Sequence, residues 1–120
     1  MDIISNKEKK EKLRESVIKM RERYPGRVPV FILKSHKDKL LPDINCNKFI
    51  VPEDISVTNL MALVRSRLSL GSEVSMFFFI NETVIPCGSD TVGNLYNTYK
   101  NEDNILLIYY CGENVFGKVL

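Results

Sequence analysis

Four short apolar runs separated by polar segments constrain the fold of this chain more than any other feature. Every residue from 28 to 33 is apolar, and further apolar runs cover residues 49–51, 76–80 and 105–110. Runs of this length bounded by turn residues are typical of strands in a sheet that is covered on one face and partly covered on the other. We therefore predict four strands, with a loop over residues 35–46 between the first two.

A leading helix is predicted from apolar residues that recur every three or four positions. A capping-box pattern at residues 5–8 (SNKE) would begin it, and Pro25 and Gly26 would end it. Residues 1–27 hold roughly nine Lys and Arg against five Asp and Glu, which is compatible with an acidic partner, a membrane surface or a solvated helix face. Packing against the sheet is the favoured role of the helix. Its apolar positions are Leu13, Val17, Met20 and Tyr24.

Two further helices complete the pattern. Ser56 is the expected N-cap of the second and Gly71 its expected end, while the third is brief and is expected to be capped by Ser89 or Asp90. The order helix, two strands, helix, strand, short helix, strand is neither a repeat nor a doubly wound alternation. It predicts an α+β fold with one four-stranded mixed sheet, the ubiquitin-like β-grasp roll with an additional N-terminal helical segment.

Length and charge limit the possible classes of function. With 120 residues, of which 44% are hydrophobic, the chain can build a single core but not a second domain. A net charge of +2 is too small to indicate a nucleic-acid binder. No apolar run approaches the roughly 18 residues needed to cross a bilayer, so any membrane attachment is expected to be peripheral or acquired by modification.

Groups that could support catalysis or metal binding are few and scattered. The only histidine, His36, lies in a Lys-rich loop, and nothing in the sequence pairs it with a cysteine. An odd number of cysteines without a CxxC pair favours a reducing compartment, and capping explains acidic pairs such as Glu102-Asp103. We expect no enzyme activity, metal or cofactor, with a small thiol enzyme as a remote alternative. The cysteines are Cys46, Cys87 and Cys111, the last of which is expected to be a small core residue.

Five stretches of the chain resemble one known family. They are RERYPGRVPVFILK, NKFIVPEDISV, FFFINETVIP, NLYNTYKNEDNILLIYY and FGKVL. Their order and spacing are similar to those of the autophagy ubiquitin-like modifiers, namely autophagy-related protein eight, GABARAP and light chain three. The branch stays open, because LLPDINCNKF resembles light chain three whereas FFFI and VIP resemble GABARAP.

The stretch FGKVL, residues 116–120, is where the resemblance implies covalent chemistry. Glycine has no Cβ, so an extended tail ending at Gly117 can thread a narrow enzyme channel and present an unhindered carbonyl. The resemblance implies that a cysteine protease, helped by Phe116, removes residues 118–120. E1-like and E2-like enzymes would then pass the Gly117 carboxylate as a thioester to phosphatidylethanolamine, and a cytoplasmic protein would become associated with autophagosomal membranes. The implied division is an N-terminal helical extension (1–26), a ubiquitin-like domain (27–116) and a processed tail (117–120).

The segment NKFIV is expected to form an exposed edge of the sheet. Unpaired N–H and C=O groups on an edge can take an extended peptide as another strand, while side-chain pockets supply specificity. The resemblance implies binding of short acidic motifs, carried by cargo receptors and adaptors, in which an aliphatic residue lies three positions after an aromatic one. The implied first pocket consists of Met20, Pro29, Lys48, Ile50 and Ile105, and the second of Phe49, Val51, Pro52, Ile55, Leu60 and Leu63. The cations expected to meet the acidic groups are Arg27, Lys48 and Arg67.

Structural explanations stay open for several of these residues. Val51, Leu60 and Leu63 would be core residues in any similar fold, and Lys48 could equally protect an edge strand from aggregation. The favoured function is that of a monomeric, lipid-conjugated modifier that recruits cargo receptors. The alternative is a non-conjugated adaptor for trafficking or cytoskeletal partners, which would keep its last three residues.

Overall fold

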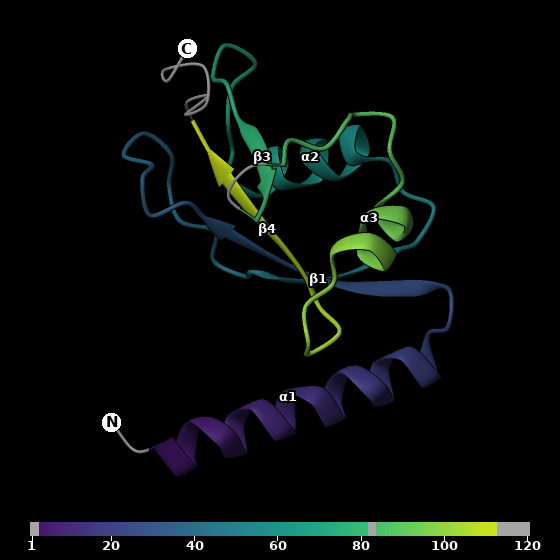
Figure 1. Cartoon of the computed structure of the whole chain (residues 1–120). Helices are drawn as coiled ribbons and strands as arrows, with labels where there is room; N and C mark the ends of the chain where they lie inside the picture. Colours follow the sequence, from purple (N-terminus) through teal and green to yellow (C-terminus); the bar gives the residue numbers. More distant parts are fainter. Residues whose placement is uncertain (1–2, 82–83, 113–120) are drawn as a thin grey trace.

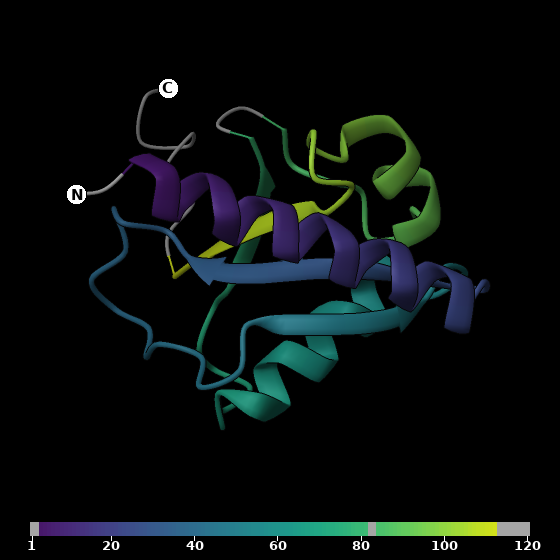
Figure 2. The same ribbon diagram turned by 90° about the horizontal axis from the view of Figure 1, so that it is seen from below.

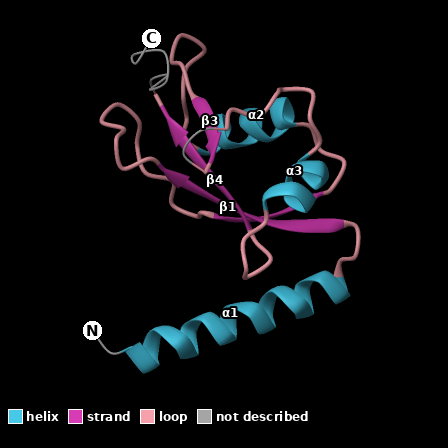
Figure 3. Ribbon diagram, viewed as in Figure 1, coloured by secondary structure: helices cyan, strands magenta, loops and turns pink. Residues whose placement is uncertain are grey.

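The computed structural model describes residues 3–81 and 84–112 of the chain. Within this part, helices and strands follow the predicted order (Figures 1 and 3). None of the described helices is long and apolar enough to cross a membrane. The elements are α1 (Ile3–Arg23), β1 (Arg27–Lys34), β2 (Lys48–Pro52), α2 (Val57–Arg67), β3 (Phe77–Ile80), α3 (Val92–Tyr99) and β4 (Leu106–Cys111).

The strands form one mixed sheet in the order β2-β1-β4-β3. β1 and β4 run parallel at its centre, while β2 and β3 pair antiparallel on the outside. The predicted four-stranded mixed sheet is therefore confirmed. Because side chains alternate between the two faces of a strand, the pairing of Val30 with Leu106 and of Ile32 with Ile108 places all four on one face.

The main core lies between that face and the two helices α2 and α3 (Figure 1). Val30 and Leu106 from the sheet meet Leu60 and Val64 from α2 and Val92 from α3, and all five side chains are fully buried. Burying one such side chain contributes about 1.5–3 kcal/mol. The apolar positions predicted from strand runs and helical periodicity therefore account for this core.

α1 is one continuous helix that covers the opposite face of the sheet (Figures 1 and 2). Val17 is buried on α1, and Ile105 is buried outside the main core cluster. The Nε–H of Arg14 donates to Oδ1 of Asp103 at 2.6 Å. Packing of α1 against the sheet is thus as predicted, but the capping role expected of Asp103 is wrong, because its carboxylate pairs with a helix 89 positions away in the sequence.

Two predicted helix starts are wrong. α1 begins at Ile3, so Ser5 lies inside the helix and cannot be its cap. Thr91 caps α3 in place of Ser89 or Asp90, because its hydroxyl accepts a hydrogen bond from the N–H of Asn94 at 3.3 Å. Ser56 caps α2 as predicted.

The predicted end of α2 is also wrong, because the helix stops before Gly71. Ser69 adopts a left-handed backbone conformation with φ of 55°. The N–H groups of Ser69 and Leu70 donate to the carbonyls of Ser66 and Arg65, each at 3.1 Å. These two bonds satisfy the last carbonyls in the pattern usually built around glycine, so a serine ends this helix.

A buried tyrosine offers a test of how the loop after β1 is held. Tyr110 is fully buried, and its hydroxyl donates to the carbonyl of Pro42 at 2.7 Å. We expect Tyr110→Phe to lower the free energy of unfolding by about 1 kcal/mol, the usual worth of one such bond, as measured by urea unfolding. The control is Tyr109→Phe, which should change it by less than about 0.5 kcal/mol because no described residue bonds that hydroxyl. Equal losses in both variants would contradict this expectation.

Candidate peptide-binding edge and tail anchor

β2 lies at one edge of the sheet, as predicted. Ile32 donates its N–H to the carbonyl of Asn47 at 2.8 Å, in register with the ladder between β1 and β2. In an antiparallel pair, bonded residues alternate with residues whose N–H and C=O groups point away from the partner strand. Lys48 and Ile50 therefore direct their backbone groups along the open edge.

Two side chains donate hydrogen bonds to the backbone carbonyls that point outward from this edge. Nη1 of Arg27 donates to the carbonyl of Ile50 at 3.2 Å, and the thiol of Cys46 donates to that of Lys48 at 3.6 Å. Both side chains are exposed, so an added strand can displace them. No described residue accepts from the outward N–H groups of Lys48 and Ile50, and free donors of this kind on an edge strand can pair with an added strand.

The first predicted pocket is only partly open in this structure. Pro29 pairs with Ile50 across β1 and β2, so both side chains lie on the face covered by α1. Ile50 is 46% exposed and Lys48 is exposed, whereas Met20 is half-buried and Pro29 is buried. Ile105 is 1% exposed, so its side chain offers almost no surface to a ligand in this structure.

Sequence reasoning missed Phe31, which lies on the same face. It pairs in register with Lys48, whose Nζ lies 5.7 Å from the centroid of its ring. The face of Phe31 was readable from the alternation that follows the buried Val30. Phe31 is therefore a further candidate for the first pocket.

The second predicted pocket merges with the core. Val51 and Leu60 are 4% and 0% exposed and belong to the main core cluster, as expected if they are core residues of the fold. Phe49 is 7% exposed, and the guanidinium of Arg67 lies 5.6 Å from its ring centroid. The members of this set that keep accessible surface are Pro52, Ile55 and Leu63.

Three exposed cations surround the edge, namely Arg27, Lys48 and Arg67. Two cavities lie elsewhere. One, of about 390 Å³, opens over β3 and β4 with His36 among its lining residues, and the other, of about 430 Å³, lies between α1 and α3 beside Tyr96. None of the predicted motif-binding residues lines either cavity.

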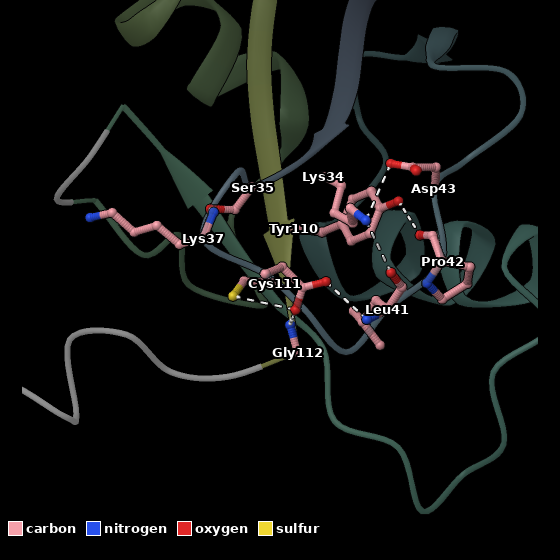
Figure 4. A network of polar contacts seen from close by, with 10 residues as sticks. Lys34, Ser35, Lys37, Leu41, Pro42, Asp43, Tyr110, Cys111 and Gly112 are labelled. Atoms are coloured by element: carbon pink, nitrogen blue, oxygen red, sulfur yellow. Dashed lines mark hydrogen bonds and ion pairs between the residues drawn. The ribbon is translucent and has the colours of Figure 1, made fainter.

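The predicted cleavage site, Phe116 and Gly117, lies outside the described residues, but the point where the chain leaves β4 is described. Gly112 follows β4 directly, and the loop after β1 folds against it (Figure 4). Asp38 from this loop is only 7% exposed. Burying a carboxylate costs free energy unless it is hydrogen-bonded, so the donors around Asp38 decide whether it can be charged there.

Backbone and thiol donors satisfy the carboxylate of Asp38, and Figure 4 labels the three residues that supply them, Leu41, Cys111 and Gly112. Oδ1 accepts from the N–H of Gly112 at 2.8 Å and from the thiol of Cys111 at 3.7 Å, and Oδ2 accepts from the N–H of Leu41 at 2.9 Å. Burial alone would raise the pKa of Asp38, but hydrogen bonds from the N–H groups of Gly112, Leu41 and Leu40 and from Cys111 together lower it. Asp38 is therefore ionised at neutral pH.

Comparisons with known proteins agree with this architecture. The model of the family described as autophagy protein Atg8, ubiquitin-like, matches residues 11–117. The chain belongs to the Atg8 family. The crystal structure of Trypanosoma brucei ATG8 is 33% identical in sequence and superposes with a TM-score of 0.80, covering 87% of this chain and 88% of that chain. The predicted ubiquitin-like fold is thus confirmed, and the Atg8 family makes the chain an autophagy ubiquitin-like protein.

The Atg8 family consists of ubiquitin-like modifiers rather than catalytic enzymes. In this member, Cys46 and Cys87 are exposed, and Cys111 is buried, as expected of a small core residue. A hydrogen bond from the Ser89 hydroxyl is the main cause of a lowered pKa at Cys87. The described hydrogen-bond partners of the three thiols do not include His36.

The lowered pKa of Asp38 predicts a pH-dependent contribution to stability. A carboxylate whose folded pKa lies below its ordinary value of 3.8 stabilises the fold above that pH, and the contribution is lost as the pH falls through the folded pKa. We expect Asp38→Asn to lower the free energy of unfolding by about 1–3 kcal/mol at pH 7, because the amide faces the N–H of Leu41 with a donor. In urea unfolding the difference from wild type should shrink below pH 3.8. A difference that is the same at pH 7 and pH 3 would contradict it.

Proposed function

We propose that this chain is a lipid-conjugated modifier that is cleaved after Gly117 and recruits receptors through the open edge of β2. The observation that carries the recruiting role is the edge itself, where Lys48 and Ile50 direct outward two N–H groups that no residue of the described part accepts, beside three exposed cations. Membership of the Atg8 family supports the conjugating role. The proposal includes the division into a helical extension (1–26), a ubiquitin-like domain (27–116) and a processed tail (117–120).

The covalent steps act on the tail. The processing cysteine protease adds water across the amide between Gly117 and Lys118, which leaves a carboxylate on Gly117 and a free amine on Lys118. The E1-like enzyme converts the carboxylate to a thioester at the expense of a nucleoside triphosphate, and the E2-like enzyme receives it. The amine of phosphatidylethanolamine then attacks the thioester carbonyl, forms an amide and releases the enzyme thiol.

Conjugation would place the protein on the autophagosomal membrane. One acyl chain gives only marginal membrane binding, whereas two chains hold firmly, at about 0.8 kcal/mol for each buried CH₂. Phosphatidylethanolamine carries two chains, so a single amide bond at Gly117 would supply the whole anchor. The domain itself then needs no apolar surface for the membrane.

The partners would be receptors and adaptors with acidic aromatic-x-x-aliphatic motifs. An added peptide strand would satisfy the edge donors, its two apolar side chains would contribute roughly 1.5–3 kcal/mol each, and ordering the peptide would offset part of this gain. The expected result is micromolar binding, near about −8 kcal/mol. Ile50 and the accessible Pro52, Ile55 and Leu63 offer the apolar surface, with Arg27, Lys48 and Arg67 for the acidic groups.

Strand addition is tested by removing one edge donor. Ile50→Pro deletes an N–H that points away from β1, so the sheet ladder stays intact, while Ile50→Ala removes the side chain and keeps the N–H. In calorimetric titration with an acidic motif peptide, we expect Ile50→Pro to bind about tenfold more weakly than Ile50→Ala, because about one backbone hydrogen bond is lost. Equal affinities would show that the peptide does not add to β2.

Conjugation is tested by the intact mass of the protein from its native cells under starvation. We expect loss of residues 118–120 followed by the gain of one phospholipid, since the free Gly117 carboxylate is the acyl donor. Gly117→Ala should fold like the wild type but give no lipid adduct, because a methyl group crowds the thioester. Recovery of the full-length chain alone would favour the non-conjugated adaptor, and a lipid adduct on the Ala variant would show that the acyl donor lies elsewhere.

A further inference from the structure

The loop between β1 and β2 is tied to the end of β4 from several sides (Figure 4). The N–H of Ser35 donates to the carbonyl of Tyr110 at 2.8 Å, and the hydroxyl of Tyr110 donates to Pro42 at 2.7 Å. Lys34, the last residue of β1, forms an ion pair with the exposed Asp43 at 3.4 Å, which joins the loop to β1 and involves neither β4 nor Gly112. The loop therefore holds a defined position over the last residues of the strand.

Asp38 is the loop residue that binds the chain just beyond the end of β4. Its Oδ1 accepts from Gly112, which follows β4, and its Oδ2 accepts from Leu41 within the loop. Gly112 also fits closely, because a Cβ there would lie 3.1 Å from Leu40 Cβ, 3.2 Å from Asp38 Oδ1 and 3.2 Å from Leu41 Cγ. One buried carboxylate thus holds Gly112 in place at the end of the sheet.

The hydrogen bond between Asp38 and Gly112 matters for Gly117 because the two glycines are close in sequence. Gly117 lies five residues beyond Gly112, and five residues span at most roughly 17 Å when extended. The region that the Gly117 carbonyl can occupy is therefore set by where Gly112 is held. A chain released at Gly112 samples more directions, and a smaller fraction of them suits an enzyme channel.

We infer that Asp38 is a positioning residue for the processing and conjugation of the tail, because it holds Gly112, the residue from which the tail starts, at a fixed point at the end of β4 when the protease and the conjugating enzymes bind. This inference rests on the proposed cleavage after Gly117. When only a fraction of molecules is competent to bind, the apparent dissociation constant rises by the inverse of that fraction. Loss of Asp38 should therefore raise the KM for the protease and leave kcat nearly unchanged, since a tail already seated in the channel reacts as before.

The test is a cleavage assay on the full 120-residue chain with the Atg8-processing cysteine protease of the cells that express it, with intact mass identifying the product that ends at Gly117. For Asp38→Ala we expect KM to rise about 3- to 10-fold with kcat within about twofold of wild type. The KM of Asp38→Asn should lie between those of wild type and Asp38→Ala, because the Oδ1 of asparagine can still accept from the N–H of Gly112. The matched control is Asp43→Ala, which removes an exposed carboxylate from the same loop without touching Gly112 and should leave both constants unchanged.

The readouts separate the possible failures. Partial unfolding of the substrate would also raise the apparent KM at unchanged kcat, because it lowers the concentration of folded substrate, so urea unfolding under the assay conditions measures the folded fraction and KM is expressed in folded substrate. A KM equal to that of wild type on this scale, or a fall in kcat at constant KM, would overturn the positioning role. Unchanged constants in both Asp38 variants would overturn it as well. If Asp38→Ala does not fold, Asp38→Asn decides the matter, with hydrogen exchange at the Gly112 N–H reporting whether the anchor is present. A wild-type chain that is not cleaved after Gly117 would instead refute the proposed function, and the inference with it.

Discussion

The parallel pairing of β1 with β4 is the interaction on which the rest of the structure depends. Val28, Pro29 and Val30 are buried in succession, which requires cover on both faces of the sheet at its centre. Parallel neighbours need a long crossover connection, and here that connection contains β2, α2, β3 and α3. With β1 and β4 in the middle, β2 and β3 take the outer positions, so the open edge of β2 follows from the central pair.

The two faces of this central pair are covered differently. α2 and α3 close one face with side chains that are almost entirely apolar. α1 covers the other with Val17 and with the ion pair between Arg14 and Asp103, while Leu13 and Met20 remain half-buried. The face under α1 is therefore the less completely buried of the two, and it is the face on which Ile50 and Lys48 lie beside the open edge.

The loop between β1 and β2 connects the edge strand with the end of β4. It carries the chain from the centre of the sheet to the edge strand, and on the way it delivers Asp38 to the end of β4. A carboxylate at this depth is stable because backbone N–H groups and a thiol surround it. The open edge of β2 and the end of β4 are thus held by one connection.

Much of this architecture was predictable because its signals are local. Continuous apolar runs marked the strands, apolar periodicity marked α1 and α2, and the serine before α2 marked its cap. Predictions failed where neighbouring residues could each satisfy the same backbone groups at a helix end. Thr91 caps α3 where Ser89 or Asp90 was expected, and Ser69 ends α2 where Gly71 was expected. The pocket residues on β2, on α2 and before β4 could be named from the sequence, but whether each was accessible depended on packing, which buried Leu60 and Ile105 and left Ile50 exposed.

The sequence by itself determined the order of the elements, the composition of the core and the family to which the chain belongs. These depend on periodicity and on residue types that are read along the chain. Only the tertiary structure decided that Arg14 meets Asp103 and that Asp38 meets Gly112, partners 89 and 74 positions apart. No local pattern encodes such pairs, because a buried charge finds its donors only after the strands between them have taken their places in the sheet.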